Sequence, residues 1–327
     1  MMERRRFIGA VACALLATGS AARAQPKQRV RQIAFLSPGE PYPPEQVREF
    51  WAPARELGWI EGQNLLVHYR YASGRLELLP SLAEELVRLK PEIIVTQGSD
   101  ATLAAKAATS SIPIIFQSSG DPVGLGLVAS LARPGGNITG LSVVSQGIDA
   151  KRLSLLRELV PGAQRVGELI NPGNAFVRKS QLEYEQAYRS LGLSPIFVDV
   201  TAAGELENAV QDIARRGAQA LVVRSDVLFY VNRDAIMRAA LKHSLPTLVG
   251  GRPYLEAGAL LSYTPDLMEQ NRRLFGLLDK VLRGAKPADL PVEQPSKFVL
   301  EINLKTAKAL GVSVPQPLLL RADEVIQ

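Results

Sequence analysis

The chain has 327 residues, of which 46% are hydrophobic and 21% charged, and its formal net charge is +6. This length and composition indicate one or two domains with ordinary hydrophobic cores and exclude a disordered chain. Half of the charge excess lies in the first 24 residues, which hold four arginines and one glutamate. The remainder does not indicate a basic nucleic-acid-binding surface, so we expect no nucleic-acid partner.

The first 24 residues have the three-part layout of a secretory signal peptide. A cationic start, Arg4–Arg6, precedes an apolar run over Phe7–Ala17, and Ala22-Arg23-Ala24 fits a cleavage site. The paired arginines before Phe7 resemble a twin-arginine signal, although a Sec signal stays open. The sequence therefore predicts export to the periplasm. A retained membrane-anchoring helix and lipidation at Cys13 are the alternatives.

From residue 31 onward, short apolar runs alternate with helical patterns. Strands are expected at Gln32–Leu36, Leu65–Tyr71, Ile93–Thr96, Ile112–Gln117, Ile138–Val143, Arg165–Ile170, Ser194–Val200, Ala220–Arg224, Thr247–Gly250, Gly258–Tyr263 and Phe298–Ile302. Helices are expected at Val47–Leu57, Leu76–Leu89, Ala101–Ala108, Val123–Leu131, Lys151–Leu159, Val177–Leu191, Leu206–Arg215, Arg233–His243, Glu269–Leu282 and before Leu310, with a kink at Pro53. Two such rounds predict an α/β fold with two Rossmann-like lobes, each built on a parallel sheet.

Small and polar residues close several of these strands. They are Gln97-Gly98-Ser99, Ser118–Asp121, Asn171–Asn174, Ser225-Asp226 and Gly250–Arg252. Ligands of such sheets bind outside the carboxyl ends of the strands, where hydroxyls and helix N-termini suit a carboxylate and an aspartate suits an ammonium group. Each loop taken alone also fits a helix cap or a turn. Taken together, the loops predict a site for a polar or zwitterionic solute.

Motifs for catalysis, cofactors and metals are missing from the sequence. Asp121–Gly126 is glycine-rich, but it matches neither a phosphate-binding loop nor a dinucleotide fingerprint. No G-x-S-x-G elbow occurs. The one cysteine is Cys13, and the two histidines are His68 and His243. We therefore expect no cofactor, no metal and no enzymatic activity.

Several segments resemble a known family. They are Asp121–Val128, Leu131–Ser142 with its Arg-Pro-Gly-Gly-Asn-Ile-Thr-Gly run, Glu56–Asn64, Ile302–Gly311 and Arg321–Ile326. This pattern resembles the ABC-transporter substrate-binding family that includes tryptophan- and tyrosine-type binding proteins. The resemblance implies a type I periplasmic-binding fold with three chain crossings. It implies one lobe of residues 31–145 and 255–285, and a second of residues 146–254 and 286–327.

The resemblance also implies a ligand in the cleft between the lobes, and a monomer that delivers it to a permease with ATPase subunits. The ligand contacts that it implies are Gly98, Ser99, Ser119 and Asp121 from the first lobe and Asn171, Ser225 and Asp226 from the second, with Tyr263 near a hinge strand. An amino acid or other small carboxylate is the expected solute, followed by an aromatic acid or amide.

Other functions stay open at this point. A ligand-sensing partner of a membrane receptor would use the same cleft. An exported enzyme would draw its acid or base from Asp121, Asp226 or His68. A repressor with the same lobes is excluded, because it would need an N-terminal helix-turn-helix where the signal peptide stands.

Overall fold

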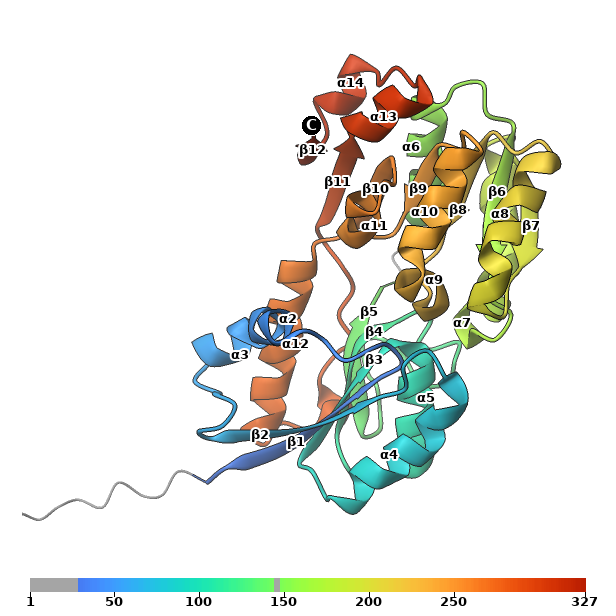
Figure 1. The fold of residues 1–327 in the computed structure, drawn as a ribbon. Coiled ribbons are helices and arrows are strands. Elements are labelled where there is room, and N and C mark those ends of the chain that lie inside the picture. Colours follow the sequence, from blue (N-terminus) through green and yellow to red (C-terminus); the bar gives the residue numbers. More distant parts are fainter. Residues whose placement is uncertain (1–28, 144–147) are drawn as a thin grey trace, which may run out of the picture. The chain divides into compact units, whose positions relative to one another are not determined.

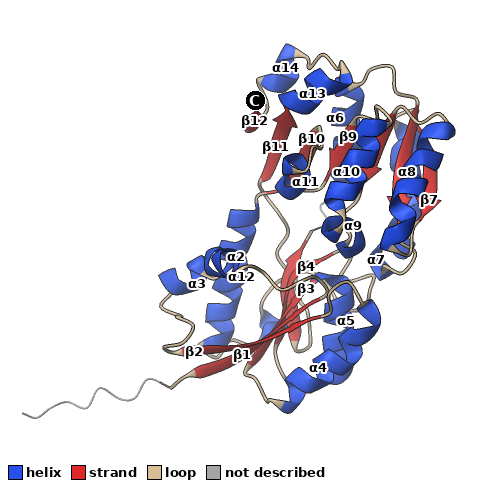
Figure 2. Cartoon of the chain, viewed as in Figure 1, coloured by secondary structure: helices blue, strands red, loops and turns tan. Residues whose placement is uncertain are grey.

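The computed structural model describes residues 29–143 and 148–327, so the predicted signal peptide lies outside the described residues. The described residues form two β-sheets, each covered by helices on both faces (Figures 1 and 2). The predicted α/β class is confirmed. All neighbouring strands pair in parallel except β10 and β11, which are antiparallel.

The first sheet has five strands in the order β2-β1-β3-β4-β5. The strands are β1 (Arg31–Ser37), β2 (Leu65–Tyr71), β3 (Ile93–Gln97), β4 (Ile114–Ser119) and β5 (Ile138–Ser142). The helices beside it are α2 (Pro44–Phe50), α3 (Ala52–Glu56), α4 (Leu79–Arg88), α5 (Gly98–Ala108) and α12 (Leu267–Leu282), with 3-10 turns at Leu76–Leu78 and Pro287–Asp289.

The alternation of side chains along β1 explains the two layers of helices around the first sheet. Ala34 and Leu36 face a core shared with α4 and α5, whereas Ile33 and Phe35 face α2, α3 and α12 on the opposite side (Figure 1). Because both faces are covered, the strand is apolar at every one of these positions.

The second sheet has seven strands in the order β12-β11-β10-β9-β8-β6-β7. They are β6 (Arg165–Ile170), β7 (Ser194–Asp199), β8 (Ala220–Val223), β9 (Thr247–Val249), β10 (Leu261–Pro265), β11 (Phe298–Asn303) and β12 (Glu324–Ile326). One face packs on α8 (Leu206–Arg215), α10 (Arg233–Lys242) and α11 (Arg252–Glu256), and the other on α6 (Ile148–Leu159), α7 (Ala175–Ser190) and α13 (Leu304–Leu310). Shorter elements are α9 (Val227–Val231), α14 (Gln316–Leu319) and a 3-10 turn at Ala203–Glu205.

The chain passes between the two sheets three times: after β5, after β10 and before β11. Two of these passages fall later than the predicted residues 255 and 286. β10 adds to the second sheet before α12 returns to the first, and Glu293 still forms a bridge with Leu141 of β5. Sheet membership here follows strand pairing, which the apolar pattern of one segment does not reveal.

Two local predictions have contrasting outcomes. The kink at Pro53 is confirmed, since the helix is broken into α2 and α3 at Trp51 and Pro53 lies in the first turn of α3. The helix predicted at Val123–Leu131 is wrong, because this segment is a series of turns. Gly126 there has φ +70°, and the Gly124 N–H donates to Asp121 Oδ1 instead of continuing a helix.

Candidate functional site

The first sheet brings Ser99 and Ser119 together. Gly98 begins α5 with φ +79°, a backbone conformation that favours glycine. This turn places Ser99 Oγ 3.1 Å from Ser119 Oγ at the end of β4, and Ser99 Oγ also accepts the Gly120 N–H at 3.1 Å. Both serines are buried. The hydroxyls are therefore fixed at the carboxyl edge of the sheet.

The second sheet brings Asn171 and Asp226 together. Asn171 follows β6, and its Nδ2 donates to both carboxylate oxygens of Asp226, at 3.1 and 3.2 Å. Asn174 Nδ2 donates to Asp226 Oδ2 at 2.8 Å, while Asn174 Oδ1 caps α7. Asp226 Oδ1 in turn accepts the Leu228 N–H and caps α9. The polar residues that close β6 and β8 thus form one bonded group.

The other predicted residues are engaged differently. Asp121 caps the turn that ends at Gly124. Ser225 is exposed beside Gly250, where an added Cβ would lie 2.7 Å from Ser225 Oγ. Tyr263 lies within β10 and stacks on Phe298, with ring centroids 5.5 Å apart. Its backbone oxygen accepts from Arg152 Nε at 2.9 Å.

A polar chain at the ends of β1 and β3 extends the predicted Gln97-Gly98-Ser99 loop with Ser37 and Tyr42, which the sequence did not indicate as site residues. Ser37 Oγ donates to Gln97 Oε1 at 2.6 Å, and Gln97 Nε2 donates to the Tyr42 hydroxyl at 2.6 Å. Burial raises the pKa of Tyr42 to about 12, against the opposing hydrogen bond from Gln97. The chain lies at the same edge of the first sheet as the two serines, because β1, β3 and β4 are parallel neighbours.

A buried ion pair beneath the second group was also missed. Arg224, at the end of β8, has its Nε 3.5 Å from Glu168 Oε1 of β6. The guanidinium lies 3.4 Å from the Tyr184 ring centroid, and its Nη2 donates to Ser180 Oγ. Glu168 Oε2 accepts from the Tyr188 hydroxyl at 2.6 Å. The available signal was a pair of opposite charges inside or next to two apolar strand runs.

Burial dominates the electrostatics of this pair. It raises the pKa of Glu168 to about 7, against the Arg224 charge and the Tyr188 hydrogen bond. Burial likewise raises the pKa of Tyr184 and of Tyr188 far above the usual value. Glu168 has no exposed side-chain surface, so no solute reaches it in this conformation.

The arrangement suits binding better than catalysis. Both oxygens of Asp226 accept hydrogen bonds from within the protein, which holds the carboxylate in a fixed orientation. His68 lies on β2 with its ring 3.3 Å from Gln32 Oε1, at the side of the sheet and outside either group. Within residues 29–143 and 148–327, no three His, Cys, Asp or Glu side chains gather as a metal site.

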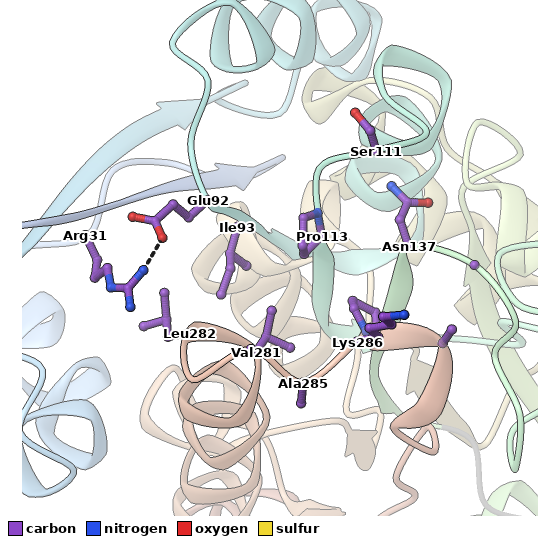
Figure 3. Close-up of a pocket in the computed structure, with 14 residues that line it drawn as sticks. Arg31, Glu92, Ile93, Ser111, Pro113, Asn137, Val281, Leu282, Ala285 and Lys286 are labelled. Atoms are coloured by element: carbon purple, nitrogen blue, oxygen red, sulfur yellow. Dashed lines mark hydrogen bonds and ion pairs between the residues drawn. The ribbon is translucent and has the colours of Figure 1, made fainter.

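A cavity of about 520 Å³ lies elsewhere, at the amino ends of β3, β4 and β5 beside the end of α12 (Figure 3). Its wall includes Ile93, Pro113 and Val281 with the Arg31–Glu92 ion pair, whose atoms are 2.5 Å apart. None of the predicted ligand contacts lines it. A second, much smaller cavity is lined by Ser225, Arg224 and Gly250 together with Asp149 of α6.

Within the described part of the chain, no helix has the length and apolar character needed to cross a bilayer.

Comparison with known proteins identifies the family. Residues 47–326 match the family model described as ABC transporter substrate binding protein. A tyrosine-binding protein of Clostridioides difficile is 27% identical over 258 residues, covering 79% of this chain and 74% of that one. A conserved domain protein from Vibrio cholerae has a similar structure, with a TM-score of 0.85, 25% identity, and 91% and 100% of the two chains covered.

An ABC domain from Streptococcus pneumonia, solved in complex with L-Trp, shares the fold. Its TM-score is 0.83 at 23% identity, over 91% of this chain and 100% of that one. The architecture is therefore the type I periplasmic-binding fold, as the family resemblance implied. Because the family model spans most of the length, this chain belongs to the ABC transporter substrate-binding proteins.

Proposed function

We propose that the protein is the extracytoplasmic solute-binding component of an ABC importer. It binds one amino acid or other small carboxylate between the polar strand ends of its two sheets and releases it to a permease driven by ATPase subunits. The twin-arginine-like start and the Ala22-Arg23-Ala24 segment support export to the periplasm. The main observation in support of this function is the pair of hydrogen-bonded polar groups at the carboxyl edges, one on each sheet.

The two groups differ in the chemistry that they offer. Ser99 and Ser119 present hydroxyls beside the first turn of α5, which suit a carboxylate. Asp226 is a buried carboxylate held by Asn171 and Asn174, and its negative charge attracts an ammonium group. An α-amino acid carries both charges on neighbouring atoms. Two relatives fit this class, since one is named a tyrosine-binding protein and another was solved with L-Trp.

The experiment is a thermal-shift screen of the mature protein with amino acids and small carboxylic acids, followed by calorimetric titration of each hit. We expect at least one amino acid to raise the melting temperature. Ser99→Ala combined with Ser119→Ala should then weaken that solute tenfold or more. Ser81→Ala, an exposed serine on α4 whose hydroxyl bonds only within its own turn, is the matched control.

Mass spectrometry of whatever co-purifies supplies an independent readout. If no amino acid or carboxylate shifts the melting temperature and none co-purifies, the proposed function is wrong. If a solute binds equally well to the double serine variant, the site lies elsewhere in the chain.

A further inference from the structure

Phe176 is tied directly to the polar group of the second sheet. It is the second residue of α7, and its N–H donates to Asn174 Oδ1 at 3.0 Å. The same Asn174 side chain donates to Asp226 at 2.8 Å. The backbone of Phe176 is therefore linked through Asn174 to Asp226, one of the predicted ligand contacts. The ring itself is half-buried and makes none of the hydrogen bonds of that group.

The ring of Phe176 lies against Gly120, the residue that follows the buried Ser119 of the first sheet. A Cβ added at Gly120 would stand 2.1 Å from a ring carbon, a distance that no packing tolerates. Gly120 does not have a positive φ, so its backbone conformation is open to other residues. The glycine is thus required for space, and the object that fills this space is the phenyl ring.

Neighbouring residues hold both Gly120 and Phe176 in position. The Gly120 N–H donates to Ser99 Oγ, and the Gly120 oxygen accepts from Ser142 Oγ at 3.0 Å. On the other side, the buried Arg224 guanidinium lies 5.9 Å from the centroid of the Phe176 ring. That cation is held in turn by Tyr184 and Ser180. These contacts hold the ring in position, and part of its surface remains exposed.

We propose that Phe176 is a selectivity residue of the solute site, with Gly120 as the residue that admits its ring. This inference rests on the proposed function and adds the apolar surface that the two polar groups lack. Hydroxyls, amides and a carboxylate orient the charged end of a solute, but they do not distinguish one side chain from another. The apolar part of the solute packs on the Phe176 ring, which favours solutes that carry a flat ring of their own.

A double-mutant cycle tests this assignment. Phe176→Ala, Gly120→Ala and the combination are titrated with L-tyrosine and L-tryptophan as ring-bearing probes and with L-alanine as the ringless probe. We expect Phe176→Ala to weaken the ring-bearing probe that the wild type binds by tenfold or more, and to change L-alanine binding by less than threefold. Phe176→Tyr should keep at least a third of the affinity.

Gly120→Ala should also weaken that probe, because its methyl group displaces the ring. With the ring absent the methyl group has nothing to displace, so the double variant should bind as Phe176→Ala does. Leu182→Ala, an exposed leucine of α7, is the matched control. The melting temperature of each ligand-free variant shows whether it remains folded.

The outcomes separate the two proposals. If the wild type binds a ring-bearing probe but Phe176→Ala leaves its affinity unchanged, the selectivity role is wrong and the proposed function stands. The same holds if the losses of binding free energy in Phe176→Ala and Gly120→Ala add in full in the double variant. If the wild type binds a ringless amino acid more tightly than either ring-bearing probe, the selectivity role is also wrong. If the wild type binds no amino acid, the selectivity role is wrong, and if it binds no small carboxylic acid either, both proposals are wrong.

Discussion

Glu168 makes a sharp prediction for stability as a function of pH. Its side chain is fully buried between Arg224 and Tyr188, and burial raises its pKa from 4.5 to about 7. A raised pKa means that folding favours the protonated carboxyl. The stabilisation is therefore complete below the unfolded-state pKa, near 4.5, and is lost as the pH rises through about 7.

The size of the effect follows from the shift. At about 1.4 kcal/mol per pH unit, a shift from 4.5 to about 7 corresponds to about 3 kcal/mol of unfolding free energy. Glu168→Gln removes the titration while keeping an oxygen that accepts from the Tyr188 hydroxyl. Relative to the wild type, this variant should gain about 3 kcal/mol between pH 4.5 and pH 8.

The assay is urea denaturation of the wild type and of Glu168→Gln at half-unit steps from pH 4.5 to 8, with both free energies extrapolated to water. Glu84→Gln, an exposed position on α4, controls for the loss of one negative charge. Parallel curves for the wild type and Glu168→Gln would show that Glu168 does not titrate in this window. The reasoning about its burial would then be refuted.

Two further predictions concern a carboxylate that several groups use as an acceptor and a glycine that has no room for a Cβ. Asp226→Ala removes a helix cap and leaves the amides of the buried Asn171 and the half-buried Asn174 without their acceptor. We therefore expect a loss of about 3 kcal/mol in urea denaturation, against no measurable change for the exposed Asp212→Ala. Gly140→Ala places a Cβ 2.2 Å from the Phe116 oxygen, at a residue whose φ is +155°. We expect this variant to lose about 3 kcal/mol of unfolding free energy or not to fold. The control is Gly162→Ala, whose Cβ meets nothing within 4 Å, and equal melting temperatures for the two variants would contradict the prediction.

The strands were predictable because both faces of each sheet are covered. A strand buried on both faces is a continuous apolar run, and the run at Ile93–Thr96 was predicted within one residue of β3. Leu65–Tyr71, at the edge of the first sheet, was predicted from its alternating pattern with the bounds of β2 itself. The segment Val123–Leu131 failed for the opposite reason. Its apolar residues have helical spacing, but Asp121 and two glycines favour turns that the apolar pattern does not record.

Chain order predicted which residues lie at the carboxyl edges, but not which of them bond to each other. Asn171 and Asp226 are 55 residues apart, and their hydrogen bonds exist because β6 and β8 are neighbours in the sheet. The contact of Phe176 with Gly120 is even harder to predict from the sequence, since it joins a helix beside one sheet to a loop of the other. Strand order and side-chain geometry decide both contacts, and neither is a property of one segment.

The passages between the sheets bear on how the two polar groups work together. Asp266 and Lys297 stand at the second and third passages, where Lys297 Nζ lies 2.7 Å from Asp266 Oδ2 and the Asp266 N–H donates to the Lys297 oxygen at 3.0 Å. Just before them, the Tyr263 oxygen accepts from Arg152 of α6. These bonds join the connecting segments at the second and third passages to each other and to the second sheet. Each polar group is bonded within its own sheet, so we expect any movement of one sheet against the other to fall on these few connecting residues.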